Sequence, residues 1–201
     1  FTCYRADAAQ KYPYLYPVLG PATGLPLTDE AGRQYPHHRS LFLGCDRVNG
    51  GNYWQEGLER GQIVSSGPKL ETESKQRIGI TDACQWRQPD SAAIIDDRRK
   101  WTITAPESGL RLIDAEIVLT ARVDVHIEKT NHSLFSIRAD LSMTPLQGGK
   151  LMDSDRRSGE KGTFGQEAAW CGYTAARLGR PESIVLMDHP RNPWSPCKWF
   201  T

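Results

Sequence analysis

The sequence predicts an all-β fold: a mostly antiparallel β-sandwich with long loops and few short helices. Several segments alternate apolar and polar residues with the period of about two that is typical of half-buried strands. Pro and Gly interrupt the chain throughout, with 13 prolines and 18 glycines among 201 residues. No segment keeps the apolar period of about 3.6 residues that marks an amphipathic helix. Many strands separated by such turns indicate a sandwich.

The first third of the chain is dense in Pro, Gly and Tyr. Its prolines leave no room for a helix, because a proline inside a helix removes a backbone hydrogen bond and clashes with the preceding turn. They are Pro13, Pro17, Pro21, Pro26 and Pro36. We expect short strands and turns here.

The middle of the chain predicts a β-hairpin. Apolar and polar residues alternate in 123–128 and again in 135–142, and a polar turn at 129–132 joins them. Arg138 and Asp140 would then project from one strand to the same face, about 7 Å apart. On a solvated face they would be an ordinary surface pair, whereas in a cleft they would bind hydroxyls or a carboxylate.

Further strands are expected at 78–86, 101–104, 110–121, 169–175 and 183–187. The segments 55–60 and 71–77 are the candidates for short helices, and the polar, glycine-rich segment 148–165 predicts a long loop. We expect one sandwich domain over residues 1–201, as a partial or end-trimmed chain.

Composition excludes several classes of protein. Twenty-five basic and 24 acidic residues give a net charge of +1, so we expect neither a nucleic-acid nor a membrane partner. No apolar run approaches the roughly 18–20 residues needed to span a bilayer. The five cysteines are scattered, which argues against a disulfide framework or structural zinc and favours buried thiols in the cytoplasm. Sandwich edges pair readily, so a homodimer is plausible.

Histidines supply the main candidates for chemistry. His37 and His38 are adjacent, and His189 opens another Pro-marked segment. Imidazole transfers protons near neutral pH and also binds metals. Neighbours in an extended segment face opposite sides, so the first two are expected to have different roles.

Other side chains complete the candidate set. Arg39 could hold an anionic or polyhydroxylated group, Trp54 and Trp170 could stack on a sugar ring, and Glu167 is a candidate general base. Each residue also has an ordinary reading: core packing for the tryptophans, a hydrogen-bonded loop position for the histidines, and solvation for the carboxylate. The G-x-S-x-G, P-loop, G-x-G-x-x-G and HExxH signatures are missing, which removes α/β-type serine hydrolases, nucleotide-binding folds and zincins.

Six ordered segments resemble the bacterial family labelled "methane oxygenase PmoA-like". They are residues 11–17 (KYPYLYP), 36–39 (PHHR), 48–54 (VNGGNYW), 135–138 (FSIR), 167–170 (EAAW) and 188–193 (DHPRNP). Where that family reads Asp-His-Pro-His-His-Arg-Gly, this chain has Gln34 and Tyr35 before Pro36, so one histidine is absent. The label is not a function for this chain, which lacks the transmembrane segments of a methane oxygenase subunit.

The resemblance implies a supersandwich fold similar to galactose mutarotase and an association with sugars. We therefore expect a small carbohydrate ligand and an enzyme that uses general acid–base chemistry. Candidate reactions are anomeric epimerisation, or elimination or hydrolysis of a keto-glycoside. The expected catalytic residues are His37, His38, His189 and Glu167, and the expected ligand-binding residues are Arg39, Trp54, Arg138, Asp140, Trp170 and Asn192.

Two other functions stay open. A non-catalytic carbohydrate-binding module would keep the aromatic residues and arginines but need no positioned base. A metal-dependent sugar enzyme would use His37 or His38, His189 and a carboxylate as mixed ligands for a divalent metal. The preferred hypothesis needs no cofactor and no metal.

Overall fold

Every pairing between the described strands is antiparallel, which confirms the predicted all-β class. The computed structural model describes residues 1–32, 35–55, 57–74, 76–130 and 133–201. Within these ranges, helical structure is limited to a short α-helix, α1 (Gly159–Thr163), and three 3-10 turns. No helix there is long and apolar enough to cross a membrane.

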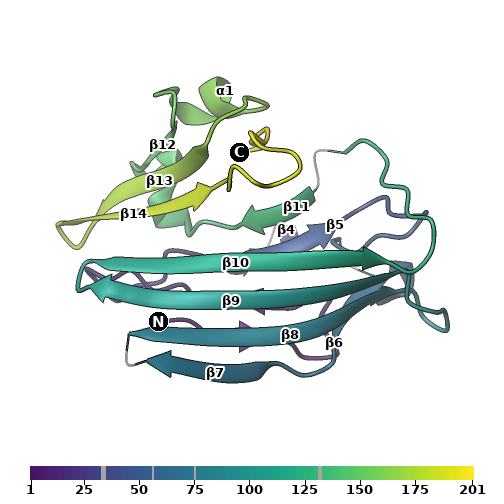
Figure 1. The fold of residues 1–201 in the computed structure, drawn as a ribbon. Helices are drawn as coiled ribbons and strands as arrows, with labels where there is room; N and C mark the ends of the chain where they lie inside the picture. The colour runs from purple at the N-terminus through teal and green to yellow at the C-terminus, as the bar shows by residue number, and fades with distance from the viewer. Residues whose placement is uncertain (33–34, 56, 75, 131–132) are drawn as a thin grey trace.

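Three sheets and a two-stranded ribbon build the fold (Figure 1). Sheet 1 has the order β1 (Tyr4–Arg5), β2 (Tyr14–Leu15), β5 (Leu41–Cys45), β11 (Ser133–Ile137). Sheet 2 has the order β10 (Leu110–Ala121), β9 (Ile95–Glu107), β8 (Arg77–Arg87), β6 (Gln62–Ser65), with β7 (Lys69–Ser74) also paired to β8. Sheet 3 consists of β12 (Lys150–Asp153), β13 (Trp170–Arg177) and β14 (Arg180–Met187). The ribbon pairs β3 (Glu30–Gly32) with β4 (Tyr35–Arg39).

Sheets 1 and 2 form the sandwich. Alternation along β9 buries one set of side chains between the sheets, with Trp101 fully buried, and leaves Arg98 exposed on the other face. Leu15 and Leu41 of sheet 1 pack around Trp101. Burial of these apolar side chains is the main stabilising contribution of the sandwich.

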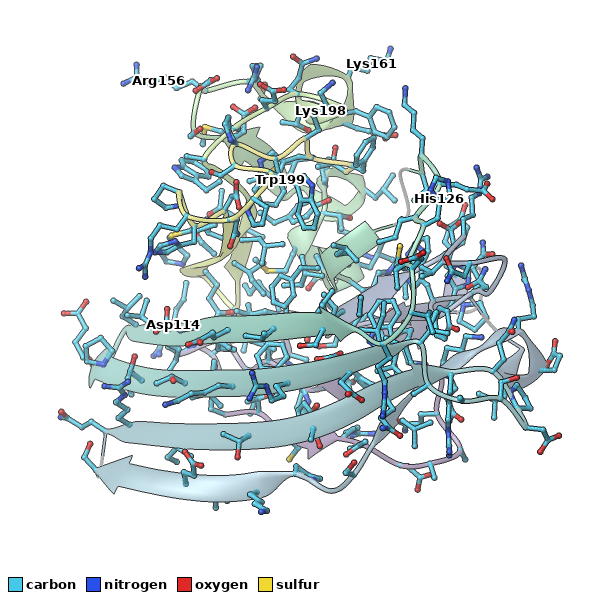
Figure 2. The ribbon with its side chains drawn as sticks, turned by 45° about the vertical axis from the view of Figure 1, so that its right-hand side comes forward. Asp114, His126, Arg156, Lys161, Lys198 and Trp199 are labelled. Atoms are coloured by element: carbon cyan, nitrogen blue, oxygen red, sulfur yellow. The ribbon has the colours of Figure 1, made fainter. Side chains whose placement is uncertain are left out.

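Sheet 3 closes one side of the sandwich. The edge strands on that side are β10 of sheet 2 and β11 of sheet 1. Leu186 of β14 packs in one cluster with Ile113 of β10 and Ile137 of β11. Figure 2 shows the same arrangement, with Trp199 in the layer of sheet 3 above Asp114 on β10.

Two local predictions are wrong. The expected hairpin does not form, because β11 pairs with β5 rather than with residues 123–128. The pairing of β11 with β5 places Phe135 and Ile137 against the cluster around Trp101. An isolated hairpin cannot bury these side chains in this way. The helix expected at 71–77 is also wrong, since Lys69–Ser74 is strand β7 and residue 75 lies outside the described residues.

Two other segments differ from expectation in part. The expected loop 148–165 contains strand β12 and helix α1, because β12 completes sheet 3 beside β13. In the described part of segment 55–60 the helical structure is a single 3-10 turn, Leu58–Arg60, and residue 56 lies outside the described residues. The other expected strands are present, and β10 has the predicted bounds.

Glu182 of β14 attaches sheet 3 to the turn at residues 20–24. Its carboxylate is 4% exposed and accepts hydrogen bonds from Ala22 N, Thr23 N and Thr23 Oγ1 at 3.2, 2.9 and 2.8 Å. It also lies 3.6 Å from Arg177 Nη1.

We expect Glu182→Ala to lower the free energy of unfolding by about 3 kcal/mol, because it removes charged hydrogen bonds and leaves a buried guanidinium with fewer partners. Glu107→Ala, at an exposed position, is the matched control and should change it by less than about 0.5 kcal/mol. Urea denaturation measures both, and equal losses would contradict the proposed anchor.

All five cysteines are free thiols, and Cys45, Cys84 and Cys171 are buried, as the sequence predicted. Burial raises the pKa of Cys45 to about 12, with a further rise from Asp46. Burial and Asp153 raise the pKa of Cys171 to about 11. Because the thiolate is the reactive form, these thiols are protonated and inert at neutral pH.

At pH 8 we expect iodoacetamide to label exposed Cys3 well before Cys45 and Cys171. Mass spectrometry of timed samples measures the order, and labelling in urea provides the control in which all thiols react. Equal rates for Cys3 and Cys45 in the folded protein would contradict the described burial.

Candidate functional site

Sheet 1 has a face that points away from the sandwich core. Alternation along β5 puts Leu41 toward Trp101 and therefore Phe42 and Gly44 on the opposite face. Phe42 pairs with Tyr14 on β2 and with Ser136 on β11, so these side chains share that face. We call it the outer face of sheet 1.

Trp54 lies directly on this face. A Cβ at position 44 would come 3.3 Å from Trp54 Cδ1, so Gly44 allows the indole to approach the strand. Asn52 Oδ1 accepts hydrogen bonds from Trp54 N and Gln55 N at 3.0 and 2.8 Å, which fixes the turn that carries the indole. The Asn-Gly-Gly-Asn-Tyr-Trp segment thus acts by positioning Trp54.

Both histidines contact Trp54. His38 stacks on the indole, with ring centroids 5.2 Å apart and an angle of 11°. It also stacks on Tyr35 at 5.1 Å and 16°. His37 meets Trp54 edge-on at 5.2 Å and 87°. Tyr35, His37, His38 and Trp54 are called the histidine cluster below.

The prediction that His37 and His38 face opposite sides is wrong. Their ring centroids lie only 4.6 Å apart. The pairing of β3 with β4 shifts register between Glu30 and Gly32, and such irregularities increase local strand twist. The Tyr12 hydroxyl donates to the carbonyl oxygen of His37, which fixes the strand at this position. The two imidazoles therefore lie close together beside Trp54.

Arg39 extends the polar part of this region. Its guanidinium lies 5.7 Å from the centroid of the Tyr14 ring, and the Tyr14 hydroxyl donates to Glu30 Oε1. Burial and the hydrogen bond to Glu30 raise the pKa of Tyr14, against an opposing effect of Arg39. Tyr14 is therefore a neutral phenol at physiological pH, and it joins the ribbon to sheet 1.

Arg138 follows β11 and is held by its backbone. Its N–H donates to Ser40 O at 2.6 Å, and its carbonyl oxygen accepts from Asp29 N at 3.0 Å. Its position beside Ser40 brings it next to the end of β4, which carries the histidines.

Asp140 does not share a strand with Arg138, so that prediction is wrong. The strand ends at Ile137, and the carboxylate of Asp140 accepts from Ser142 N at 2.9 Å at the start of a 3-10 turn. It also lies 3.9 Å from Arg177 Nη2. Short acidic side chains favour such capping positions, and this one serves local structure.

His189 and Asn192 lie in the segment after β14. Asn192 Nδ2 donates to Asp188 Oδ1 at 2.7 Å, and His189 Nδ1 accepts from Arg191 N at 3.2 Å. These contacts close the Pro-marked turn on itself, and His189 is exposed. Their predicted roles in chemistry and binding stay predictions.

Glu167 and Trp170 belong to the layer of sheet 3. The exposed Glu167 bridges through its backbone to Lys198, which Figure 2 shows in that layer. Trp170 is half-buried at the start of β13 and pairs with Met187. The structure brings His37, His38 and Trp54 together, whereas the Arg39 guanidinium lies over Tyr14. The contacts described for Glu167 and Trp170 stay within residues 153–198.

The sequence reasoning did not single out Tyr35 and Tyr173. Tyr35 is 41% exposed and is the most accessible aromatic ring of the histidine cluster. In the sequence, the signal that could have indicated Tyr35 as a site residue is its place beside Pro36 and the two histidines. Arg138 lowers the pKa of Tyr173 on β13, against a larger rise from burial, and a single strand pattern does not reveal that electrostatic interaction.

Two polar depressions lie elsewhere on the described part of the chain, one of them beside Gln62 and Arg87. A polar depression of about 310 Å³ is lined by Asp46, Arg47, Asn52, Gln55, Arg60 and Glu128 with two glycines, and none of the predicted site residues lines it. Among the described residues, no group of three or more His, Cys, Asp or Glu side chains could hold a metal ion.

These features define an all-β sandwich protein with a polar and aromatic outer face on sheet 1. The chain belongs to DUF6807, a family of unknown function, whose model matches residues 1–201. No curated protein and no solved structure matches it.

Proposed function

We propose that this protein acts on a carbohydrate bound at the outer face of sheet 1, by general acid–base chemistry. The observation that supports the proposal is the gathering of two imidazoles and an exposed tyrosine ring around Trp54. Aromatic rings bind the apolar faces of sugars, and imidazoles exchange protons with hydroxyls and leaving groups near neutral pH. The resemblance described above to a sugar-associated family favours the same ligand class.

Each member of the histidine cluster receives a role in this proposal. Tyr35, through its exposed ring, stacks on the sugar. Trp54 is 7% exposed and is stacked by His38, so it supports the histidine rather than the ligand. His37 and His38 act as an acid–base pair, since rings 4.6 Å apart can serve the same ligand. The reaction is an anomeric epimerisation, or an elimination or hydrolysis of a keto-glycoside.

A non-catalytic carbohydrate-binding module is the second candidate. The observation that favours it is the stack of Tyr35, His38 and Trp54, because a histidine held between aromatic rings can serve as part of an apolar platform. Binding without turnover in the experiment below would select this candidate. The homodimer and the cytoplasmic location stay predictions.

The test combines calorimetry and NMR on the intact chain with glucose, galactose, their methyl glycosides and the corresponding 3-keto-glycosides. We expect saturable binding of at least one sugar and conversion of at least one. Tyr35→Ala should weaken binding about tenfold, the order of an aromatic stacking contact. Trp194→Ala, which removes an indole that is 66% exposed elsewhere on the chain, is the matched control and should bind like the wild type. The proposal would be contradicted if no sugar of this panel bound to the protein and none was converted.

A further inference from the structure

Arg138 differs from the three buried or half-buried arginines that pair with a carboxylate. Arg99 pairs with Asp97 at 2.5 Å, Arg157 with Asp153 at 2.6 Å, and Arg177 lies 3.6 Å from Glu182. Arg138 is half-buried as well, yet no carboxylate lies within ion-pair distance of it among the described residues. Its Nε is buried and has no hydrogen-bond partner there.

An unsatisfied Nε–H of this kind is costly. Removing an N–H donor from water without a compensating hydrogen bond destabilises the folded state by about 1–3 kcal/mol. The nearest acidic candidate along the chain, Asp140, caps the 3-10 turn instead. A bound oxyanion would satisfy the donors, because guanidinium groups form paired hydrogen bonds with carboxylates.

The surroundings of Arg138 suit a carboxylate. Tyr173 of β13 lies close enough for Arg138 to lower the pKa of its phenol, although burial raises that pKa overall. Tyr173 therefore stays a neutral phenol. Glu160 also raises the pKa of Tyr173. Glu160 is exposed on α1, where water screens its charge.

The position of Arg138 links it to the histidine cluster. The backbone N–H of Arg138 donates a hydrogen bond to Ser40 O, two residues beyond His38. The backbone hydrogen bonds to Ser40 and Asp29 fix the guanidinium stem at the end of β4. One ligand can therefore reach both groups if its ring lies at the histidines and its charged substituent points toward β11.

We propose that the ligand is an acidic sugar whose carboxylate is bound by the Arg138 guanidinium. This inference rests on the carbohydrate function proposed above and specifies the ligand class. The bound sugars are uronic acids or their derivatives.

Calorimetry with matched sugar pairs tests this inference on the intact chain. Glucuronate and galacturonate should bind at least about tenfold more tightly than glucose and galactose, the order of a charge-assisted hydrogen bond. Arg138→Gln should abolish this preference by weakening the binding of the acidic sugars. Arg98→Gln, at an exposed arginine on β9, is the matched control and should retain the preference.

A second measurement leaves the protein unchanged, in case Arg138→Gln does not fold. The methyl ester of glucuronate has no charge, so the wild type should bind it about as weakly as glucose. Equal wild-type affinity for neutral and acidic sugars would overturn the inference, as would a full preference in Arg138→Gln or equal weakening of both series. In each of those outcomes sugars still bind, whereas failure of both series to bind the wild type would overturn the proposed function itself.

Discussion

Asp97→Ala is expected to lower the free energy of unfolding by about 3–5 kcal/mol, because it leaves a buried guanidinium without its counter-charge. Both side chains of the pair are 0% exposed, with Arg99 Nη2 2.5 Å from Asp97 Oδ2. Trp86 Nε1 also donates to this carboxylate at 3.1 Å. The pair lies between the sheets, and Arg99 Nη1 donates to Pro13 O at 3.2 Å, so its loss also weakens the contact with sheet 1.

Asp96→Ala is the matched control for this experiment. It removes a carboxylate from the neighbouring position on the same strand, where Asp96 is 42% exposed and pairs with Arg122 at 3.2 Å. Exposed pairs contribute less than about 1 kcal/mol. Urea denaturation of the two variants should separate them clearly, and a loss below about 1 kcal/mol in Asp97→Ala would contradict the described burial.

The second large effect is expected at His38. On any sugar that the wild type converts, His38→Ala should lower kcat at least about 100-fold, the usual contribution of a positioned general acid or base. Because alanine also removes a ring that stacks on Trp54, His38→Gln serves as a second variant that retains polar bulk but cannot titrate. His37→Ala should show a comparable loss, since the two rings form one acid–base pair.

His126→Ala is the control for the histidine variants. Figure 2 shows His126 on the segment after β10, and its described hydrogen bonds with Asn49 use the backbone. Its kcat should stay within about twofold of the wild type. Steady-state kinetics with folded, monodisperse variants measures all four proteins. Near wild-type kcat in both His38 variants would contradict a proton-transfer role.

Local pattern predicted much of the fold. Residues 110–121, with frequent apolar and β-branched residues, form β10 over the predicted range. The hairpin failed because β11 finds its partner, β5, far away in sequence, and local alternation does not identify a distant partner. The strand β9 illustrates a further gap: the run Asp96–Asp97–Arg98–Arg99 resembles a solvated charge cluster, yet alternation buries Asp97 and Arg99 beside Trp101.

The candidate site was predictable only in part. The sequence pointed to His37 and His38, but strand geometry assigned them to opposite sides, whereas the irregular β3–β4 ribbon brings both to Trp54. The isolation of Arg138 from carboxylates depends on where Asp140 turns, and the capping role of Asp140 appears only in three dimensions. The approach of Tyr173 to Arg138 depends on how sheet 3 packs against sheet 1.

The most direct test of a sugar site on the outer face of sheet 1 is NMR titration of the isotope-labelled chain with glucuronate. We expect saturable shifts in the ring signals of His37, His38 and Tyr35 and in the Arg138 Nε–H signal, with little change at His126. Shifts confined to the depression around Asp46 and Arg60, or no saturable shift at the histidine cluster with this or any other sugar of the panel, would contradict the proposed site.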